Sequence, residues 1–174
     1  MSLDTPRLTL LPSAPELLVT LIDDPDHFED QAGLRAADGL RGFFVSDEVS
    51  PQWLAELRNG RGPDPWRYGF FVIHRESEAV IGSGGFTGPP DTSGTVEIAY
   101  GIVPGFEGKG YATEVAAALV EFASANAGVR RIRAHTLPAT NASTRVLEKC
   151  GFRHTETIQD PVDGLIWRWE RDPA

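Results

Sequence analysis

One stretch of the chain, from Thr95 to Glu121, constrains the fold more than any other. It begins as a strand, because apolar side chains recur at every second position from Val96 to Ile102. Pro104 and Gly105 end that strand, and a glycine-rich loop follows. The loop runs into a predicted helix whose apolar residues recur at three- and four-residue spacing. The stretch therefore predicts a strand, a glycine loop and a helix N-terminus in succession.

Such a succession is suited to binding an anion. The first N–H groups of a helix have no partner within it, and the helix dipole places partial positive charge at the same end. Glycines let a phosphate approach the backbone, because they carry no Cβ. The spacing excludes both the Gly-Lys-Ser/Thr ending of nucleotide-triphosphate loops and the three-glycine dinucleotide fingerprint. An ordinary strand-to-helix connection is the alternative interpretation of the loop alone.

Length and composition indicate an ordinary folded domain. The 174 residues are expected to form a single domain spanning residues 1–174, with 41% hydrophobic and 24% charged residues. No apolar run approaches the roughly 20 residues that span a bilayer, and the N-terminus shows no secretory signal pattern. Cys150 is the only cysteine, and the four histidines show no metal-ligand spacing. We therefore expect a cytoplasmic protein without a membrane segment, an intramolecular disulfide or a metal.

The formal net charge is −9, from 16 basic and 25 acidic residues. This excess of acidic groups argues against a nucleic-acid-binding surface. It would suit cationic substrates such as amines, although an acidic surface also serves solubility alone.

The rest of the pattern predicts an α+β domain. We expect strands at 5–11, 68–74, 79–87, 95–103, 131–136, 152–158 and 165–170, and late helices after the glycine loop and at 141–149. A capping box from Ser13 to Glu16 is expected to open an early helix. Residues 26–65 are expected to form helices and loops over the sheet, including a helix that starts at Ser50. Neither an internal repeat nor a linker divides the chain.

Two motifs in this order resemble those of the GNAT acetyltransferases. Glu107 to Ala112 resembles the acyl-CoA diphosphate loop of that family, Gln/Arg-x-x-Gly-x-Gly/Ala. Thr140 to Phe152 resembles its closing helix, Asn-x-Ala/Pro-Ser-x-x-Val-Leu-Glu-Lys-x-Gly-Phe, and follows the loop by one helix and one strand. The resemblance covers Ile73 to about Trp169, and the opening Arg7-Leu8-Thr9-Leu10 extends it to the N-terminus. It is closest to the branch that includes the ribosomal-protein N-terminal acetyltransferases.

The resemblance implies a GNAT-type mixed, mostly antiparallel central sheet flanked by helices. Two neighbouring strands, at 100–103 and 134–136, would splay to admit the pantetheine arm. The implied activity is an acetyl-CoA-dependent N-acetyltransferase that acts on a primary amine, either a peptide N-terminus or a small amine, without a metal, a nucleic acid or a membrane. A non-catalytic acyl-CoA-binding or sensing module on the same fold is the alternative. The oligomeric state stays open between a monomer and a homodimer.

By the same resemblance, the diphosphate would lie on the glycine loop and the first helical turn, and the pantetheine amides would pair with strand backbone. The implied cofactor-binding residues are Ile102, Val103, Glu107, Gly108, Lys109, Gly110, Tyr111, Ala112, Thr113, Asn141 and Arg145. Glu107 replaces the usual Gln or Arg, so Lys109 and Arg145 would have to supply the countercharge. The usual Asn of the closing motif falls on Thr140, one residue before Asn141.

Acetyl transfer needs a base for the amine proton and a donor for the leaving thiolate. Glu97 is the candidate base, acting through water, with a surface carboxylate as the alternative. Ser143 is the candidate donor, as in relatives, with helix capping as its alternative role. His135 is expected to be packed or hydrogen-bonded rather than catalytic, and Cys150 to be a small core residue rather than a nucleophile. Gly101 is expected at a bulge or a close backbone approach, or to relieve twist.

The pKa of the acceptor bears on its identity. A lysine side chain with a pKa near 10.4 costs about 4–5 kcal/mol to deprotonate at neutral pH, whereas an α-amine with a pKa near 7.7–8.0 costs about 1 kcal/mol. One partly exposed carboxylate is a modest base, so an amine of low pKa suits it better. Peptide N-termini, an antibiotic and a small polyamine all stay open as acceptors.

Overall fold

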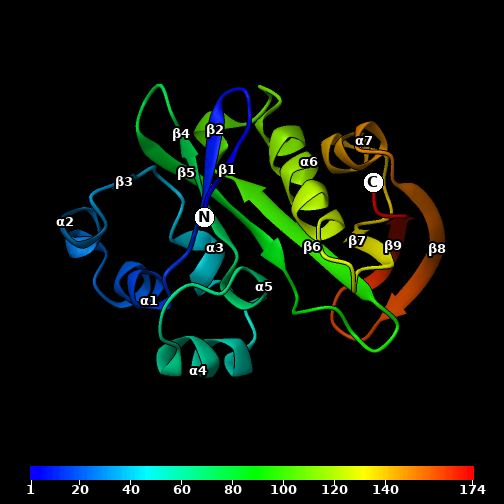
Figure 1. The fold of residues 1–174 in the computed structure, drawn as a ribbon, viewed down its shortest axis with the longest axis horizontal. Helices are drawn as coiled ribbons and strands as arrows, with labels where there is room; N and C mark the ends of the chain where they lie inside the picture. The colour runs from blue at the N-terminus through cyan, green and yellow to red at the C-terminus, as the bar shows by residue number, and fades with distance from the viewer.

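Nine strands form one mixed sheet in the computed structural model, which describes residues 1–174 (Figure 1). They are β1 (Leu3–Asp4), β2 (Leu8–Pro12), β3 (Arg35–Ala36), β4 (Phe70–His74), β5 (Ala79–Phe86), β6 (Thr95–Ile102), β7 (Arg131–Thr136), β8 (Arg153–Asp160) and β9 (Gly164–Arg171). Their spatial order is β1-β2-β4-β5-β6-β7-β9-β8, with β3 beside β5 off this path. Only the pairs β6–β7 and β3–β5 are parallel. The mixed, mostly antiparallel sheet confirms the predicted α+β fold.

Helices cover both faces of this sheet. They are α1 (Pro15–Asp23), α2 (Phe28–Ala32), α3 (Gly42–Val45), α4 (Pro51–Asn59), α5 (Pro65–Tyr68), α6 (Tyr111–Ser124) and α7 (Ala142–Lys149), with 3-10 turns η1 (Pro25–His27) and η2 (Pro104–Phe106). Consecutive residues of β4 show the two layers: Phe70 packs on Phe122 of α6, and Phe71 packs on Phe28 of α2. Helix α6 therefore lies on the opposite face from α2.

The sequence between residues 26 and 65 forms helices and loops over the sheet, as predicted, except for strand β3, which pairs with β5 and was not predicted. Ser50 caps α4, since its Oγ accepts the N–H of Trp53 at 3.3 Å. The predicted capping box at Ser13 is wrong. Helix α1 has Ala14 as its N-cap without a side-chain cap, and the Ser13 Oγ is buried without a partner. The Ser13 N–H instead donates to the Gly69 carbonyl at 2.9 Å.

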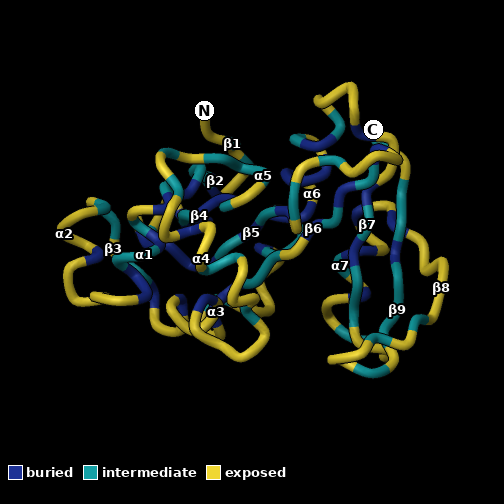
Figure 2. The backbone as a smooth tube through the Cα atoms, turned by 90° about the horizontal axis from the view of Figure 1, so that it is seen from below, coloured by how far each residue is buried: buried dark blue, intermediate teal, exposed yellow.

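Strands β6 and β7 pair only over their first residues. Residues Thr95–Glu97 face Arg131–Arg133, and beyond that point β6 and β7 no longer pair with each other, although each stays paired with its other neighbour. Figure 2 shows the consequence: the N-terminal elements and the strands β7–β9 lie on opposite sides of β6. The predicted splayed pair is therefore present. None of the helices combines the length and the hydrophobicity of a membrane-spanning segment.

Candidate functional site

A cavity of about 250 Å³ opens where β6 and β7 separate. Its lining comes from β6, from β7 with the residue that follows it, and from the start of α7: Glu97, Ile98, Ala99, Tyr100, Ala134, His135, Thr136, Leu137, Asn141, Ser143 and Leu147. The two residues predicted from the sequence to carry the chemistry, Glu97 and Ser143, therefore line the same cavity.

A larger hollow of about 700 Å³ lies between the first six residues and α6. It does not reach the gap between β6 and β7, and its least exposed carboxylate, Glu114, is already bound by Thr5 and Arg7. The smaller cavity is therefore the candidate site, because only there does a carboxylate face a gap in the sheet.

The backbone of β6 presents free groups to this gap. Val103 donates its N–H to Ile81 at 2.8 Å, and its carbonyl accepts from Phe106 at 3.0 Å. Groups of an antiparallel strand alternate in direction, so the N–H and C=O of Tyr100 and Ile102 point away from β5 and into the gap. The prediction for Ile102 agrees with this geometry. The N–H and C=O of Val103, the other residue predicted here, are already bonded within the chain, whereas those of Tyr100 face the gap.

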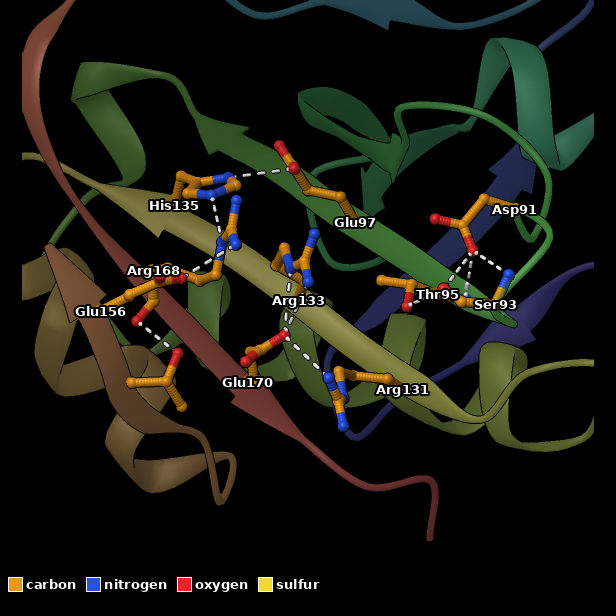
Figure 3. A network of polar contacts seen from close by, with 11 residues as sticks. Asp91, Ser93, Thr95, Glu97, Arg131, Arg133, His135, Glu156, Arg168 and Glu170 are labelled. Carbon is orange, nitrogen blue, oxygen red and sulfur yellow. Dashed lines mark hydrogen bonds and ion pairs between the residues drawn. The ribbon is translucent and has the colours of Figure 1, made fainter. Parts of the chain in front are cut away.

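Glu97 and His135 form a pair across the gap (Figure 3). The Oε1 atom of Glu97 lies 3.0 Å from Nδ1 of His135, and the two side chains are 30% and 20% exposed. The predicted hydrogen-bonded histidine is confirmed, and its partner is the candidate base. A carboxylate held in this way is partly shielded from water while still open to the cavity.

The N-terminus of α7 leaves Ser143 free. Asn141 is the N-cap: its Oδ1 accepts the N–H of Thr144 at 3.1 Å, and its own N–H donates to Thr144 Oγ1 at 2.9 Å. Ser143 is exposed to the cavity and bonds to no other residue of the chain, so its alternative role as a helix cap is wrong. The amide NH₂ of Asn141 is also without a partner. Arg145, one turn into the helix, is exposed and forms no ion pair.

The glycine loop is open on its outer side. Gly108 and Gly110 have φ of +75° and +86°, and a Cβ at Gly108 would meet no atom within 4 Å. The backbone N–H groups of residues 108–113 have no acceptor within the protein. This row of N–H donors, at the positive end of α6, could hold an anion with several negative oxygens.

Tyr111 anchors the start of α6 from inside. Its hydroxyl lies 2.9 Å from Nε2 of His74, whose Nδ1 lies 2.7 Å from Ser77 Oγ. Phe106 packs edge-on against the His74 ring at 5.2 Å. The side chain of Tyr111 is buried, so only its N–H faces the loop. Ala112, which is half-buried, presents its N–H in the same way.

The charges near the loop include one that sequence reasoning missed. Glu107 is exposed without an ion pair, and the Lys109 ammonium lies 5.8 Å from the Phe106 ring centre. Arg7 stacks over the Tyr111 ring at 4.3 Å, and its Nη2 is the one group that a Cβ on Gly110 would approach, at 3.1 Å. Arg7 opens the family-like Arg-Leu-Thr-Leu segment, but nothing local in the sequence indicates that β2 starts beside α6.

A carboxylate on α6 holds Arg7 in this place. Its Nε donates to Oε2 of Glu114 at 2.6 Å. Burial alone would raise the pKa of Glu114, but hydrogen bonds from Thr5 and Arg7 outweigh burial and lower that pKa. Glu114 is therefore ionised at neutral pH, and it fixes the arginine beside the loop.

Two largely buried ionisable groups, Tyr100 and Cys150, stay protonated at neutral pH. Burial raises the pKa of the Cys150 thiol, whose Sγ lies 3.7 Å from the Thr113 carbonyl in the core. This confirms the prediction of a small core residue. Burial also raises the pKa of Tyr100 well above its usual value, so the phenol lining the cavity keeps its proton.

Gly101 is a point of close approach. The pairing of β6 with β5 is unbroken there, so the predicted bulge is wrong. A Cβ at Gly101 would lie 2.9 Å from the ring of Phe43 in α3, so the predicted close approach is made by an aromatic side chain rather than by backbone.

Comparison with known sequences identifies relatives of the chain. Residues 7–153 match the family model described as "Acetyltransferase (GNAT) domain". The chain is 29% identical over 110 residues to an uncharacterized N-acetyltransferase, YjdG, of Bacillus subtilis. That match covers 63% of this chain and 63% of YjdG, so the chain spans less than two thirds of the length of this curated relative.

Solved structures show the same fold. A GNAT-family acetyltransferase from Bacillus anthracis superposes with a TM-score of 0.66 and 19% sequence identity. The match covers 99% of this chain and 99% of that protein's chain. A RimL ribosomal L7/L12 alpha-N-protein acetyltransferase in complex with coenzyme A covers 99% of this chain with 98% of its own, with a TM-score of 0.66 and 14% identity.

Proposed function

The chain belongs to the GNAT acetyltransferase family, and from this premise we propose that it is an N-acetyltransferase that transfers an acetyl group from acetyl-CoA to a primary amine. One observation carries the proposal. The gap between β6 and β7 is lined from one strand by the Glu97 carboxylate and from α7 by the Ser143 hydroxyl. A base and a proton donor that share one cavity are what acyl transfer from a thioester to an amine requires.

The residues present fit acetyl-CoA. The free N–H groups of residues 108–113 and the open space beside Gly108 suit a diphosphate, with Lys109, Arg145 and Arg7 as countercharges. We assign the pantetheine amides to the backbone of Tyr100 and Ile102, whose N–H and C=O groups have no strand partner in the gap. The free amide NH₂ of Asn141 is a further donor at the cavity.

When bound, acetyl-CoA supplies an acetyl thioester whose carbonyl carbon bonds to the amine nitrogen while the carbon–sulfur bond breaks and its electron pair stays on sulfur. Glu97 takes the proton that the amine nitrogen loses, through a water molecule. Ser143 donates a proton toward the sulfur and recovers one from solvent. Tyr100 is a second protonated hydroxyl in the same cavity, so the two donors have to be separated by substitution.

We favour an α-amine, such as a peptide N-terminus, as the acceptor. Such an amine needs only about 1 kcal/mol to lose its proton at neutral pH, against about 4–5 kcal/mol for a lysine side chain. One carboxylate that is partly exposed to solvent meets the first demand more readily than the second. RimL, whose structure shares this fold, is an alpha-N-protein acetyltransferase, which is consistent with this choice.

An acetyl-transfer screen tests the proposal. The purified protein is incubated with acetyl-CoA and a panel of short peptides, polyamines and aminoglycosides, and release of the free thiol is followed. We expect turnover with at least one amine, with peptide α-amines ahead of lysine side chains. Binding of CoA without turnover on any amine would overturn the proposal and favour a non-catalytic acyl-CoA sensor.

A further inference from the structure

Glu97 has an unusual set of neighbours for a strand carboxylate. The parallel register places Arg133 directly opposite Glu97. Yet Arg133 turns to Glu170 on β9, with its Nη2 and Nε at 2.9 and 3.1 Å from Oε2 of Glu170. The partner of Glu97 is instead His135, two residues further along β7. The Arg133 guanidinium, which lies opposite Glu97, is thus bound to Glu170 instead. A carboxylate without an arginine partner is a better proton acceptor than one that is paired with an arginine.

The second ring nitrogen of His135 is also bound. Arg168 on β9 donates its Nε–H to Nε2 of His135 at 3.1 Å. A guanidinium can only donate, so Nε2 must be the accepting nitrogen and carry no proton. The ring proton of the neutral imidazole then lies on Nδ1, where it points at Oε1 of Glu97. Arg168 in this way selects the tautomer that can bond to Glu97.

The arginine is itself held in place. Its Nη1 lies 3.0 Å from Oε2 of Glu156 on β8, and its own side chain is 25% exposed. Four neighbouring strands thus contribute one member each to a line of contacts, Glu97, His135, Arg168 and Glu156 (Figure 3). Strand pairing sets the backbone positions of these residues, so the register of the sheet brings the line from the exposed Glu156 to the cavity.

The contacts leave one oxygen of Glu97 committed and the other free. In Figure 3 the Oε1 atom meets the His135 ring and the second oxygen points away from it. On the premise of the proposed function, we propose that His135 is a positioning residue that holds the Glu97 carboxylate toward the acceptor, and that Arg168 sets the tautomer His135 needs. A neutral imidazole orients the carboxylate without adding the positive charge that would weaken it as a base.

The tautomer can be measured without any assay of activity. Nitrogen-15 chemical shifts of the His135 ring, in protein labelled at histidine and assigned with a His135→Gln variant, report which nitrogen carries the proton. We expect a protonated Nδ1 and an unprotonated Nε2 in the unchanged protein, and a mixture of tautomers in Arg168→Gln. A protonated Nε2 in the unchanged protein overturns the inference, whether or not an acetyl acceptor has been found.

Two substitutions of His135 separate positioning from mere packing. The side-chain amide of His135→Asn places an N–H donor near the former Nδ1, whereas that of His135→Gln places one near the former Nε2. With the best amine from the screen, we expect kcat to fall roughly ten-fold in His135→Gln, less than the 10²–10⁴ of removing a base, and to stay near normal in His135→Asn. Equal losses in the two variants would overturn the positioning role.

Arg133→Gln is the matched control for loss of charge. Arg133 lies on β7, on the same face of the sheet as Arg168 of β9, but it is bound to Glu170 rather than to His135. We expect kcat to be unchanged in Arg133→Gln and to fall in Arg168→Gln, with the KM for acetyl-CoA unchanged in both. If kcat fell as far in Arg133→Gln as in Arg168→Gln, the loss of any arginine on this face would explain the effect. That result would contradict the specific role proposed for Arg168.

The decisive experiment places His135→Gln in a Glu97→Gln background. A residue that acts through Glu97 has nothing left to position there, so the second substitution should lower kcat no further. A second ten-fold loss would mean that His135 acts independently of Glu97, and would overturn the inference. If the unchanged protein acetylates no amine, the proposed function fails by itself, and the nitrogen shifts still decide the contact.

Discussion

The parallel pair β6–β7 has two ends that do opposite things. At the closed end, residues 95–97 and 131–133 form a short ladder, and the arginines on β7 pair with Glu170 at 2.9 and 3.8 Å. At the open end the strands part, and the N–H and C=O groups of Tyr100 and Ile102 that face away from β5 meet a cavity instead of β7. Buried or half-buried backbone without a partner is costly unless water or a ligand meets it. The closed end stabilises the sheet so that the open end can stay unpaired.

The largest expected effect on CoA binding concerns the loop that follows the open end. Gly110→Asp puts a Cβ and a negative charge beside the free N–H groups, where we place the diphosphate. We expect CoA affinity, measured by calorimetry, to fall roughly 10²-fold or more, since each lost charge–dipole contact is worth about 0.3–1 kcal/mol and steric exclusion adds to it. Gly33→Asp is the matched control, because Gly33 also has a positive φ, of +70°, lies outside the loop, and a Cβ there meets no atom within 4 Å. Normal affinity in a folded Gly110→Asp protein would remove the loop from the site.

Substitutions of Glu97, at the open end, and Glu170, at the closed end, compare the two ends directly. Glu97→Gln keeps size and hydrogen-bonding reach but accepts no proton, so kcat should fall roughly 10²–10⁴-fold while CoA affinity holds. The loss should shrink as pH rises, because the amine then arrives deprotonated. Glu170→Gln should instead lower the unfolding temperature and leave kcat unchanged, because Glu170 pairs with Arg133 away from the cavity. Near-normal turnover in Glu97→Gln would end its assignment as the base.

Ser143 and Tyr100 are the two hydroxyls at the open end. If Ser143 protonates the leaving thiolate, Ser143→Ala should lower kcat roughly ten-fold or more, and raising the pH should not restore it, because the defect lies in the leaving group. Tyr100→Phe tests the rival donor with the same assay. A large loss in Tyr100→Phe together with normal turnover in Ser143→Ala would move the role to the phenol.

Lys109 and Glu107 should have smaller effects of opposite sign. Lys109→Ala should weaken CoA binding about two- to five-fold, and more at low salt than at high salt, because the side chain is exposed and screened. Glu107→Gln removes a carboxylate from beside the diphosphate and should leave binding equal or tighter. Clear weakening in Glu107→Gln would give that carboxylate a positive role.

The smallest effect is the acid sensitivity of the closed end. Burial alone would raise the pKa of Glu170, but hydrogen bonds from Arg133 and Thr155 and the charges of Arg133 and Arg131 together outweigh burial, so the pKa lies below its ordinary value of 4.5. A depressed carboxyl pKa contributes stability that is present above 4.5 and is lost as pH falls through the lowered value. Arg133→Gln should therefore be less stable than the unchanged protein near neutral pH, by urea unfolding, and the difference should narrow in acid. Glu121→Gln, at an exposed carboxylate without an ion pair, should show no such narrowing.

Much of the open end was predictable from the sequence because its signals are local. The alternation in β6, the positive-φ glycines at 108 and 110 and the apolar stripe of α6 each lie within a few residues of one another. The motif order added the splayed pair and the two chemical candidates. All of these depend on short-range pattern, which a single sequence carries.

What the sequence missed depends on register between distant segments. Arg7 reaches the loop because β2 starts beside α6, and Val103 is engaged because Ile81 lies opposite it. The tautomer of His135 depends on which residue of β9 faces it. Ser13 has the local pattern of a cap, but its N–H bonds to Gly69 and its hydroxyl is buried. In each case a tertiary contact overrides or adds to the local preference.

The buried hydrogen bond between Tyr111 and His74 has a thermodynamic consequence for the loop. It fixes Tyr111, the first residue of α6, to His74 of β4. No residue of β4 lines the cavity. The conformational entropy of the loop is thus lost when the protein folds rather than when a ligand arrives. An anion that binds there meets donors that are already aligned, so little of its binding free energy is spent on ordering the loop. Because His74 of β4 holds Tyr111, a less stable β4–β5 hairpin should also weaken anion binding.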